Sequence, residues 1–125
     1  STDYIETKIT SYKNGYLNLQ HKGGYVARYY VYWDEVTYDE NGIESIRSRE
    51  WEDNGKNRTA GFQTELQFRG NVRNLRVKIQ EKTGLAWEPW RTVYNRTELP
   101  LVQKRTIINS GTTLKPKYSE QVENN

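Results

Sequence analysis

Apolar and polar residues alternate along several segments of this chain with a period of two. In residues 25–33 the odd-numbered side chains are Tyr, Ala, Tyr, Val and Trp, and similar alternation occurs in residues 62–68 and 74–80. This period is typical of strands with one buried face and one face in water. Shorter segments between turn signals such as Asn-Gly and Gly-Gly also favour strands: residues 4–12, 15–21, 43–49, 91–95 and 104–109.

The pattern predicts an all-β fold. No window of twelve residues keeps a helical period, so we expect at most a turn or two of helix. Seven or eight strands favour an antiparallel β-sandwich, formed as a single domain by residues 1–125. Residues 115–125 are polar with little to bury, and we expect a partly disordered tail. The chain starts with neither Met nor a signal segment, which suggests one domain of a larger protein.

The amino-acid composition excludes several classes of function. The 125 residues include no Cys and one His, and 19 basic residues against 16 acidic ones give a net charge of +3. Zinc-thiolate sites and cysteine nucleophiles are therefore excluded, and there are no dense basic blocks of the kind that bind nucleic acid. His21 falls in an expected turn, and residues 39–44 lack the ligand spacing of a calcium loop. We expect no enzyme activity and no metal, cofactor or nucleic-acid partner.

One segment concentrates apolar side chains where the chain is expected to turn. Residues 81–91 read Glu-Lys-Thr-Gly-Leu-Ala-Trp-Glu-Pro-Trp-Arg, and the Gly, Glu and Pro favour a loop. The plainer alternative is that both indoles pack in the core. Moving one exposed Trp of about 200 Å² into an apolar phase yields about 5 kcal/mol, so two exposed indoles are enough to dock a domain on a membrane interface.

Residues 81–91 resemble the undecapeptide of the cholesterol-dependent cytolysins, Glu-Cys-Thr-Gly-Leu-Ala-Trp-Glu-Trp-Trp-Arg, and agree with it at nine of eleven positions. Residues 111–114, Gly-Thr-Thr-Leu, resemble the family ending in which a Thr-Leu pair recognises cholesterol. Residues 21–24 and 59–61 match two further family loops. The resemblance implies a β-sandwich of two four-stranded sheets, with these four loops at one tip. It also implies a secreted pore-forming toxin that binds cholesterol-rich host membranes.

The resemblance also assigns roles to single residues. Thr113 and Leu114 would contact cholesterol, and Arg91 would couple binding to changes elsewhere in the toxin. Lys82 replaces the family Cys and Pro89 replaces a Trp, so we expect no thiol sensitivity and more reliance on a receptor. In the family, other domains form the homo-oligomer and the pore, so this chain is expected to be a monomer that binds without lysing. The expected membrane contacts are Leu85, Ala86, Trp87, Trp90, Arg91, Gly24 and Ala60.

A second pattern concerns the long strand. Tyr30 and Tyr32 would share one face about 7 Å apart, and a four-residue Asp-Glu-Asn-Gly turn would bring Arg47 back near the level of Asp34 to Tyr32. Tyr-X-Tyr followed after fourteen residues by Arg-Ser resembles the signature of cytolysins whose receptor is protectin, the human lipid-anchored complement inhibitor. We expect Tyr30, Tyr32, Arg47 and Ser48 to bind it. The alternative is that the tyrosines only stabilise cross-strand pairs.

Another class of function also fits a β-sandwich rich in aromatic side chains. Tryptophans and surface tyrosines can stack on sugar rings, so a carbohydrate-binding module is the alternative to membrane recognition. A lectin would ignore the cholesterol content of a membrane.

Overall fold

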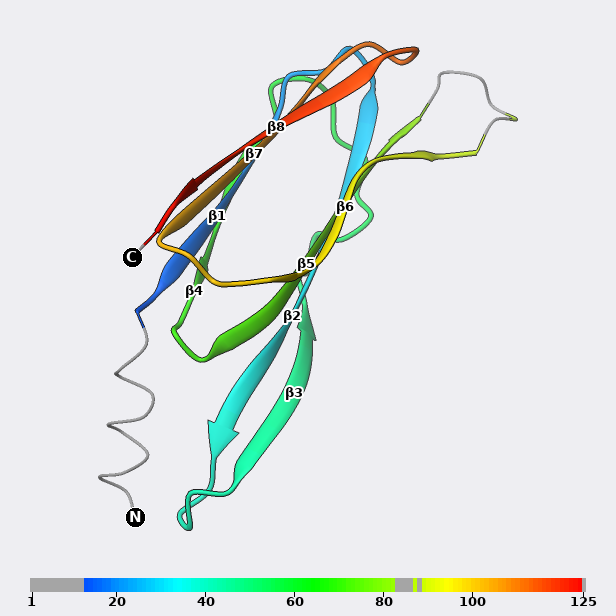
Figure 1. The fold of residues 1–125 in the computed structure, drawn as a ribbon. Helices are drawn as coiled ribbons and strands as arrows, with labels where there is room; N and C mark the ends of the chain where they lie inside the picture. The colour runs from blue at the N-terminus through cyan, green and yellow to red at the C-terminus, as the bar shows by residue number, and fades with distance from the viewer. Residues whose placement is uncertain (1–12, 83–86, 88, 125) are drawn as a thin grey trace.

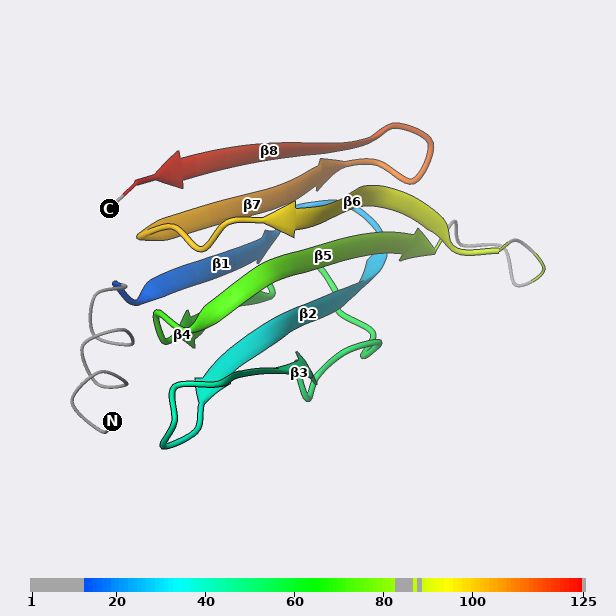
Figure 2. The same ribbon diagram turned by 60° about the horizontal axis from the view of Figure 1, so that its bottom comes forward.

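The computed structural model describes residues 13–82, 87 and 89–124, and these contain eight strands. The strands pair in two four-stranded sheets, in the orders β4-β1-β7-β8 and β3-β2-β5-β6, which lie face to face (Figures 1 and 2). The predicted β-sandwich is confirmed, whereas the strand expected at residues 4–12 lies outside the described residues. The bounds are β1 (Gly15–His21), β2 (Val26–Tyr38), β3 (Glu44–Glu50), β4 (Gln63–Phe68), β5 (Val72–Lys82), β6 (Arg91–Leu99), β7 (Lys104–Gly111) and β8 (Pro116–Glu123).

The core lies between the two sheets and follows the predicted alternation. Ala27, Tyr29 and Val31 of β2 are at most 1% exposed, and the alternating Leu75, Val77 and Ile79 of β5 are at most 2% exposed. Each sheet therefore contributes one apolar face, and burial of these faces drives the packing.

The sandwich is antiparallel except for one pair of strands. β1 and β7 run parallel, with Leu17 opposite Arg105 and Leu19 opposite Ile107. The sequence pattern does not distinguish the two pairings, because both alternate with a period of two.

The prediction of a partly disordered tail at residues 115–125 is wrong. Residues 116–123 form β8, an edge strand that pairs antiparallel with β7 from Gly111↔Pro116 to Lys104↔Glu123. Its residues are exposed or half-buried, so little apolar area holds it in place. Backbone pairing stabilises it instead, together with Glu120, whose carboxylate accepts hydrogen bonds from Tyr94, Arg96 (2.7 Å) and Arg105 (3.3 Å).

The strand directions place the connections at two ends of the molecule. β1, β5 and β7 finish at the same end, which we call the tip, and β3 runs toward that end but stops opposite Tyr32, whereas the hairpin between β2 and β3 points to the opposite end (Figures 1 and 2). The chain segments that resemble the cytolysin loops all follow strands that run toward the tip.

Candidate functional site

Backbone hydrogen bonds join three of the connections at the tip. The N–H of Gly24 donates to the carbonyl oxygen of Gly111 at 2.9 Å, and the N–H of Gly61 donates to that of His21 at 2.8 Å. The His21 N–H donates in turn to the Phe62 carbonyl at 2.8 Å. Three of the four loops predicted to share one tip are thus joined to one another, whereas residues 83–86 and 88 of the fourth lie outside the described residues.

The Thr113-Leu114 pair forms the outermost part of the β7–β8 turn. The Thr112 N–H donates to the Lys115 carbonyl, and the Lys115 N–H donates to the Thr112 carbonyl, both at 3.2 Å. This closes a two-residue loop in which Leu114 is 83% exposed and Thr113 half-buried. An apolar side chain is thus exposed to water beside a hydroxyl at the end of a hydrogen-bonded hairpin.

The undecapeptide supplies a second apolar group at the tip. Trp87 is 80% exposed, whereas Trp90 is half-buried, and the Arg28 guanidinium lies 4.1 Å from its ring centre. The Lys82 ammonium lies 5.6 Å from the same ring. Among the other expected contacts, Gly24 and Ala60 are exposed, and Leu85 and Ala86 lie outside the described residues.

A buried polar network supports the tip from below. His21, Tyr29 and Asn109 are at most 1% exposed. The Tyr29 hydroxyl donates to Oδ1 of Asn109, and Nδ2 of Asn109 lies 3.1 Å from Nδ1 of His21. The Tyr25 hydroxyl donates to the carbonyl of Ser110 at 2.8 Å. These bonds connect β1, β2 and β7 directly beneath the loops, and burial raises the pKa of both tyrosines.

Arg91 joins the undecapeptide to the Thr-Leu turn. Its Nη2 atom donates to the carbonyl oxygen of Thr113 and lies 3.0 Å from Oε1 of Glu81. Glu81 is completely covered, and burial raises its pKa while the positive charge of Arg91 partly offsets that rise. The first and last residues of the undecapeptide therefore form an ion pair at the base of the loop.

The proposed receptor residues lie within β2 and the edge strand β3 and not in the turns of the tip. Tyr32 pairs with Glu50, and Asp34 pairs with Ser48. Because directly opposed residues point to the same side of a sheet, Ser48 shares a face with Tyr30 and Tyr32. The Arg28 and Lys78 side chains lie 5.5 and 5.1 Å from the Tyr30 ring centre on this face.

The expected position of Arg47 is wrong by one residue. It pairs with Glu35, so its side chain leaves β3 on the face opposite the tyrosines. Five residues, 39–43, separate the two strands rather than four, and the Asp39 N–H donates to the Ile43 carbonyl at 3.0 Å in the same register as the Tyr38↔Glu44 pair. A shift of one residue moves every side chain of the returning strand to the other face.

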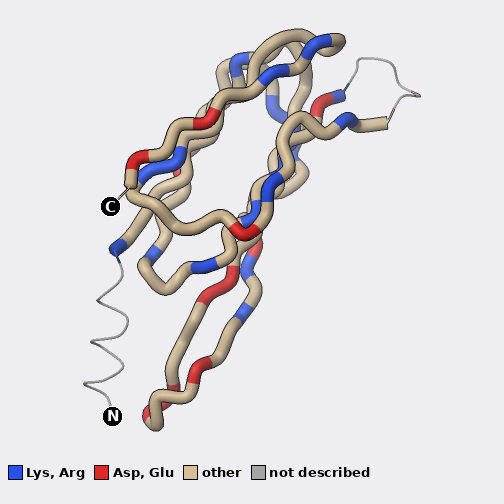
Figure 3. The backbone as a smooth tube through the Cα atoms, in the orientation of Figure 1, with Lys and Arg blue, Asp and Glu red and all other residues tan. Residues whose placement is uncertain are grey.

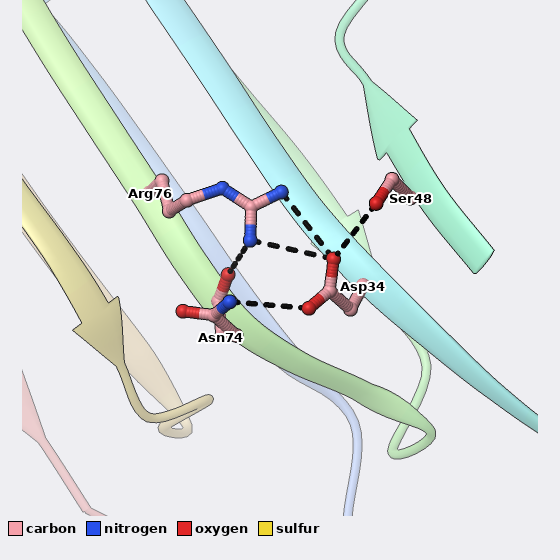
Figure 4. Close-up of polar contacts among 4 residues, drawn as sticks. All are labelled: Asp34, Ser48, Asn74 and Arg76. Atoms are coloured by element: carbon pink, nitrogen blue, oxygen red, sulfur yellow. Dashed lines mark hydrogen bonds and ion pairs between the residues drawn. The ribbon is translucent and has the colours of Figure 1, made fainter. Parts of the chain in front are cut away.

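Asp34 ties Ser48 to the rest of the sheet (Figure 4). The Ser48 hydroxyl donates to Asp34 Oδ1 at 3.3 Å, and Nη1 and Nη2 of Arg76 donate to the same oxygen at 3.3 Å. Nδ2 of Asn74 donates to the other oxygen at 3.1 Å. The hydrogen bond from Asn74 and the positive charge of Arg76 lower the pKa of Asp34. One carboxylate thus connects β2, β3 and β5.

The surface charge is mixed. Lys and Arg residues occur along β2, β5 and β6 and in the connections at the tip, whereas Asp and Glu residues are more frequent on the β2–β3 hairpin (Figure 3). In the described part of the chain, no helix is long and apolar enough to cross a membrane. The same residues contain no cluster of three or more His, Cys, Asp or Glu side chains suited to a metal ion.

The sequence is similar to known proteins over most of its length. Residues 16–117 match the thiol-activated cytolysin beta sandwich domain. Pneumolysin of Streptococcus pneumoniae serotype 2 is 58% identical over 124 residues, which cover 99% of this chain and 26% of pneumolysin. The structure of the membrane-binding domain of pneumolysin is 55% identical with a TM-score of 0.85, and the match covers 90% of this chain and 100% of that domain.

Intermedilysin gives a third match. The structure of its disulfide-locked mutant with human CD59 is 54% identical to this chain with a TM-score of 0.83, and the match covers 90% of this chain and 25% of that one. This chain therefore belongs to the thiol-activated cytolysin family, as its C-terminal β-sandwich domain. It spans about a quarter of the length of the full-length relatives.

Two residues important to the tip were not predicted as site residues. Glu81 occupies the next inward position after Leu75, Val77 and Ile79, so the alternation alone would have placed a carboxylate in the core. Asn109 gave no such signal, because its partners come from strands that are distant in sequence.

Proposed function

We propose that this chain is the membrane-recognition domain of a secreted pore-forming toxin, and that its tip binds cholesterol in host membranes. The main support is that Trp87 and Leu114, both at least 80% exposed, follow β5 and β7, which belong to different sheets and both end at the tip. The related pneumolysin domain is a membrane-binding domain, which supports the same role here.

The tip offers the chemistry that a sterol needs. The Thr113 hydroxyl can exchange a hydrogen bond with the sterol 3-OH, while Leu114 packs on the rings. Transfer of the exposed Trp87 ring from water contributes a few kcal/mol at about 25 cal/mol per Å². Binding is shallow, because loop backbone cannot enter the hydrocarbon core without losing its hydrogen bonds to water.

Liposome flotation with and without cholesterol tests this function. The double variant Thr113→Gly with Leu114→Gly is expected to lose binding to cholesterol liposomes while its circular dichroism spectrum stays unchanged. Undiminished binding would contradict the sterol role. If the chain binds to a glycan array and its liposome binding does not depend on cholesterol, a carbohydrate-binding module is favoured instead.

We further propose that Tyr30, Tyr32, Arg47 and Ser48 bind a host protein receptor, protectin (CD59). Intermedilysin has been solved with human CD59, which supports a receptor role for this domain type. Overall identity does not select a receptor-using subgroup, because the structures of the pneumolysin domain and of intermedilysin match this chain at 55% and 54%. The Tyr-X-Tyr and Arg-Ser residues therefore provide the specific support.

The position of Arg47 suggests how the receptor would dock. β3 is an edge strand, and all seven of its residues are exposed. A partner that pairs with the free edge of β3 would reach Ser48 on one face and Arg47 on the other. Tyr30→Ala and Arg47→Ala are expected to weaken binding to human cells far more than binding to cholesterol liposomes. Equal losses on both surfaces would argue against a receptor site.

A further inference from the structure

Glu81 is a carboxylate at a core position. It follows Ile79 on the inward face of β5, lies between Ala27 and Arg91 in the sheet, and is 0% exposed. Neither carboxylate oxygen has an aligned hydrogen bond within the described residues. Burial of a charge with so little compensation is unfavourable, and an apolar residue would stabilise this position better. Stability therefore does not explain the acid.

Arg91 links this acid to the turn. Its side chain is 46% exposed, and its Nη2 atom lies 3.0 Å from Glu81 Oε1 while donating to the carbonyl oxygen of Thr113. A half-exposed arginine loses rotamer freedom when it is held in one position. The nearby charge of Glu81, shielded from water, supplies the attraction that offsets this loss.

We propose that Glu81 is a positioning residue for membrane recognition, because it holds Arg91 against the Thr113 carbonyl and so fixes the Thr-Leu turn relative to the undecapeptide. This inference deepens the proposed function and depends on it. The two apolar groups of the tip, Trp87 and Leu114, meet the membrane together only if their loops keep one relative position. Among the described residues, the hydrogen bond from Arg91 to the Thr113 carbonyl joins these loops, and the ion pair with Glu81 holds Arg91 in place.

Glu81→Gln tests the role because it keeps the size of the side chain and removes its charge. The free energy of unfolding in urea is expected to stay equal or rise, because a buried charge is removed. Binding to phosphatidylcholine–cholesterol vesicles is expected to weaken by about fivefold or more, the usual range for coupling between sites. Glu65→Gln is the matched control, since Glu65 is exposed on β4 and should bind as wild type.

A double-mutant cycle with Arg91→Gln shows whether Glu81 acts through Arg91. If it does, Glu81→Gln has no further effect on vesicle binding in the Arg91→Gln background. Glu81→Gln should also shift the backbone amide NMR signal of Leu114 without vesicles present. If the losses of vesicle binding in the two variants are additive, or if the Glu81→Gln variant binds vesicles like wild type, the positioning role of Glu81 is wrong while the proposed function still stands. If the wild-type chain ignores cholesterol vesicles, the proposed function fails with it.

Discussion

Nδ1 of His21 accepts a hydrogen bond from the backbone N–H of Gly23 at 3.1 Å. Its Nε2 atom lies 2.8 Å from the carbonyl oxygen of Tyr25, which can only accept, so Nε2 carries the hydrogen. Nδ1 also faces the amide of Asn109 at 3.1 Å. Protonation of Nδ1 would place a donor opposite a backbone donor, so the site favours the neutral ring.

The first prediction is a loss of stability at mildly acidic pH. Burial lowers the pKa of His21 below its ordinary value of 6.5, so the unfolded chain binds a proton more readily than the folded chain. The contribution of His21 is therefore complete above pH 6.5 and is lost as pH falls from 6.5 through the folded pKa. Urea unfolding between pH 5 and 8 measures this dependence, and His21 is the only histidine.

Glu81 gives stability the opposite pH dependence, and its contribution must be separated from that of His21. Its raised pKa means that the folded chain holds a proton more readily, so its contribution is present below pH 4.5 and is lost as pH rises through the folded pKa. We therefore expect the His21 dependence to be clearest in the Glu81→Gln variant. A free energy of unfolding that does not change between pH 5 and 7 in that variant would refute the assignment.

The second prediction concerns the glycine that precedes the Thr-Leu turn. Gly111 has a φ of 86°, and a Cβ atom there would lie 2.2 Å from the carbonyl oxygen of Lys115. Gly111→Ala is expected to cost about 1–3 kcal/mol and to weaken vesicle binding. Gly24→Ala is the control, because its Cβ would meet only the Gly111 carbonyl at 3.8 Å. If the two variants unfold at the same urea concentration, the backbone of the turn does not need a glycine.

The third prediction separates stability from binding with two tryptophans. Trp87 is 80% exposed, so Trp87→Ala should change the free energy of unfolding by no more than about 0.5 kcal/mol. Trp33 packs edge-on against Phe68 with ring centres 5.0 Å apart, so Trp33→Ala should cost about 2 kcal/mol or more. When vesicle binding is divided by the amount of folded protein, only the Trp87→Ala variant should bind cholesterol vesicles more weakly than wild type. If both folded variants bind vesicles equally, Trp87 is not part of the membrane-binding site.

Local periodicity was enough to predict most strands. The segment 15–21 coincides with β1, and the alternation over residues 25–33 and 74–80 identified the buried faces of β2 and β5. These strands are buried on one side, so their hydrophobic pattern reports their position directly. β8 has no such pattern because it is an exposed edge strand, and only its partner β7 defines it.

Features that depend on a single backbone conformation were not predictable. Asn74 and Glu98 have positive φ values of 52° and 57°, and the pairings of β5 shift register beside them. Their side chains gave no signal for these bulges. The position of Arg47 depends in the same way on one residue of turn length. Local pattern therefore located the tip, whereas the faces of the receptor residues required the strand register.

The fourth prediction tests whether Asp34 supports the proposed receptor face. Asp34→Ala removes the acceptor for Ser48, Asn74 and Arg76, and should cost about 1–3 kcal/mol because hydrogen bonds to a charged group are lost. The pKa of Asp34 is lowered, so its contribution is present above pH 3.8 and is lost as pH falls through the folded pKa. Hydrogen exchange should rise most in the edge strand β3, whereas cholesterol-vesicle binding at the distant tip should not change. Exchange that rises equally in β7 would show that Asp34 serves global stability and not the receptor face.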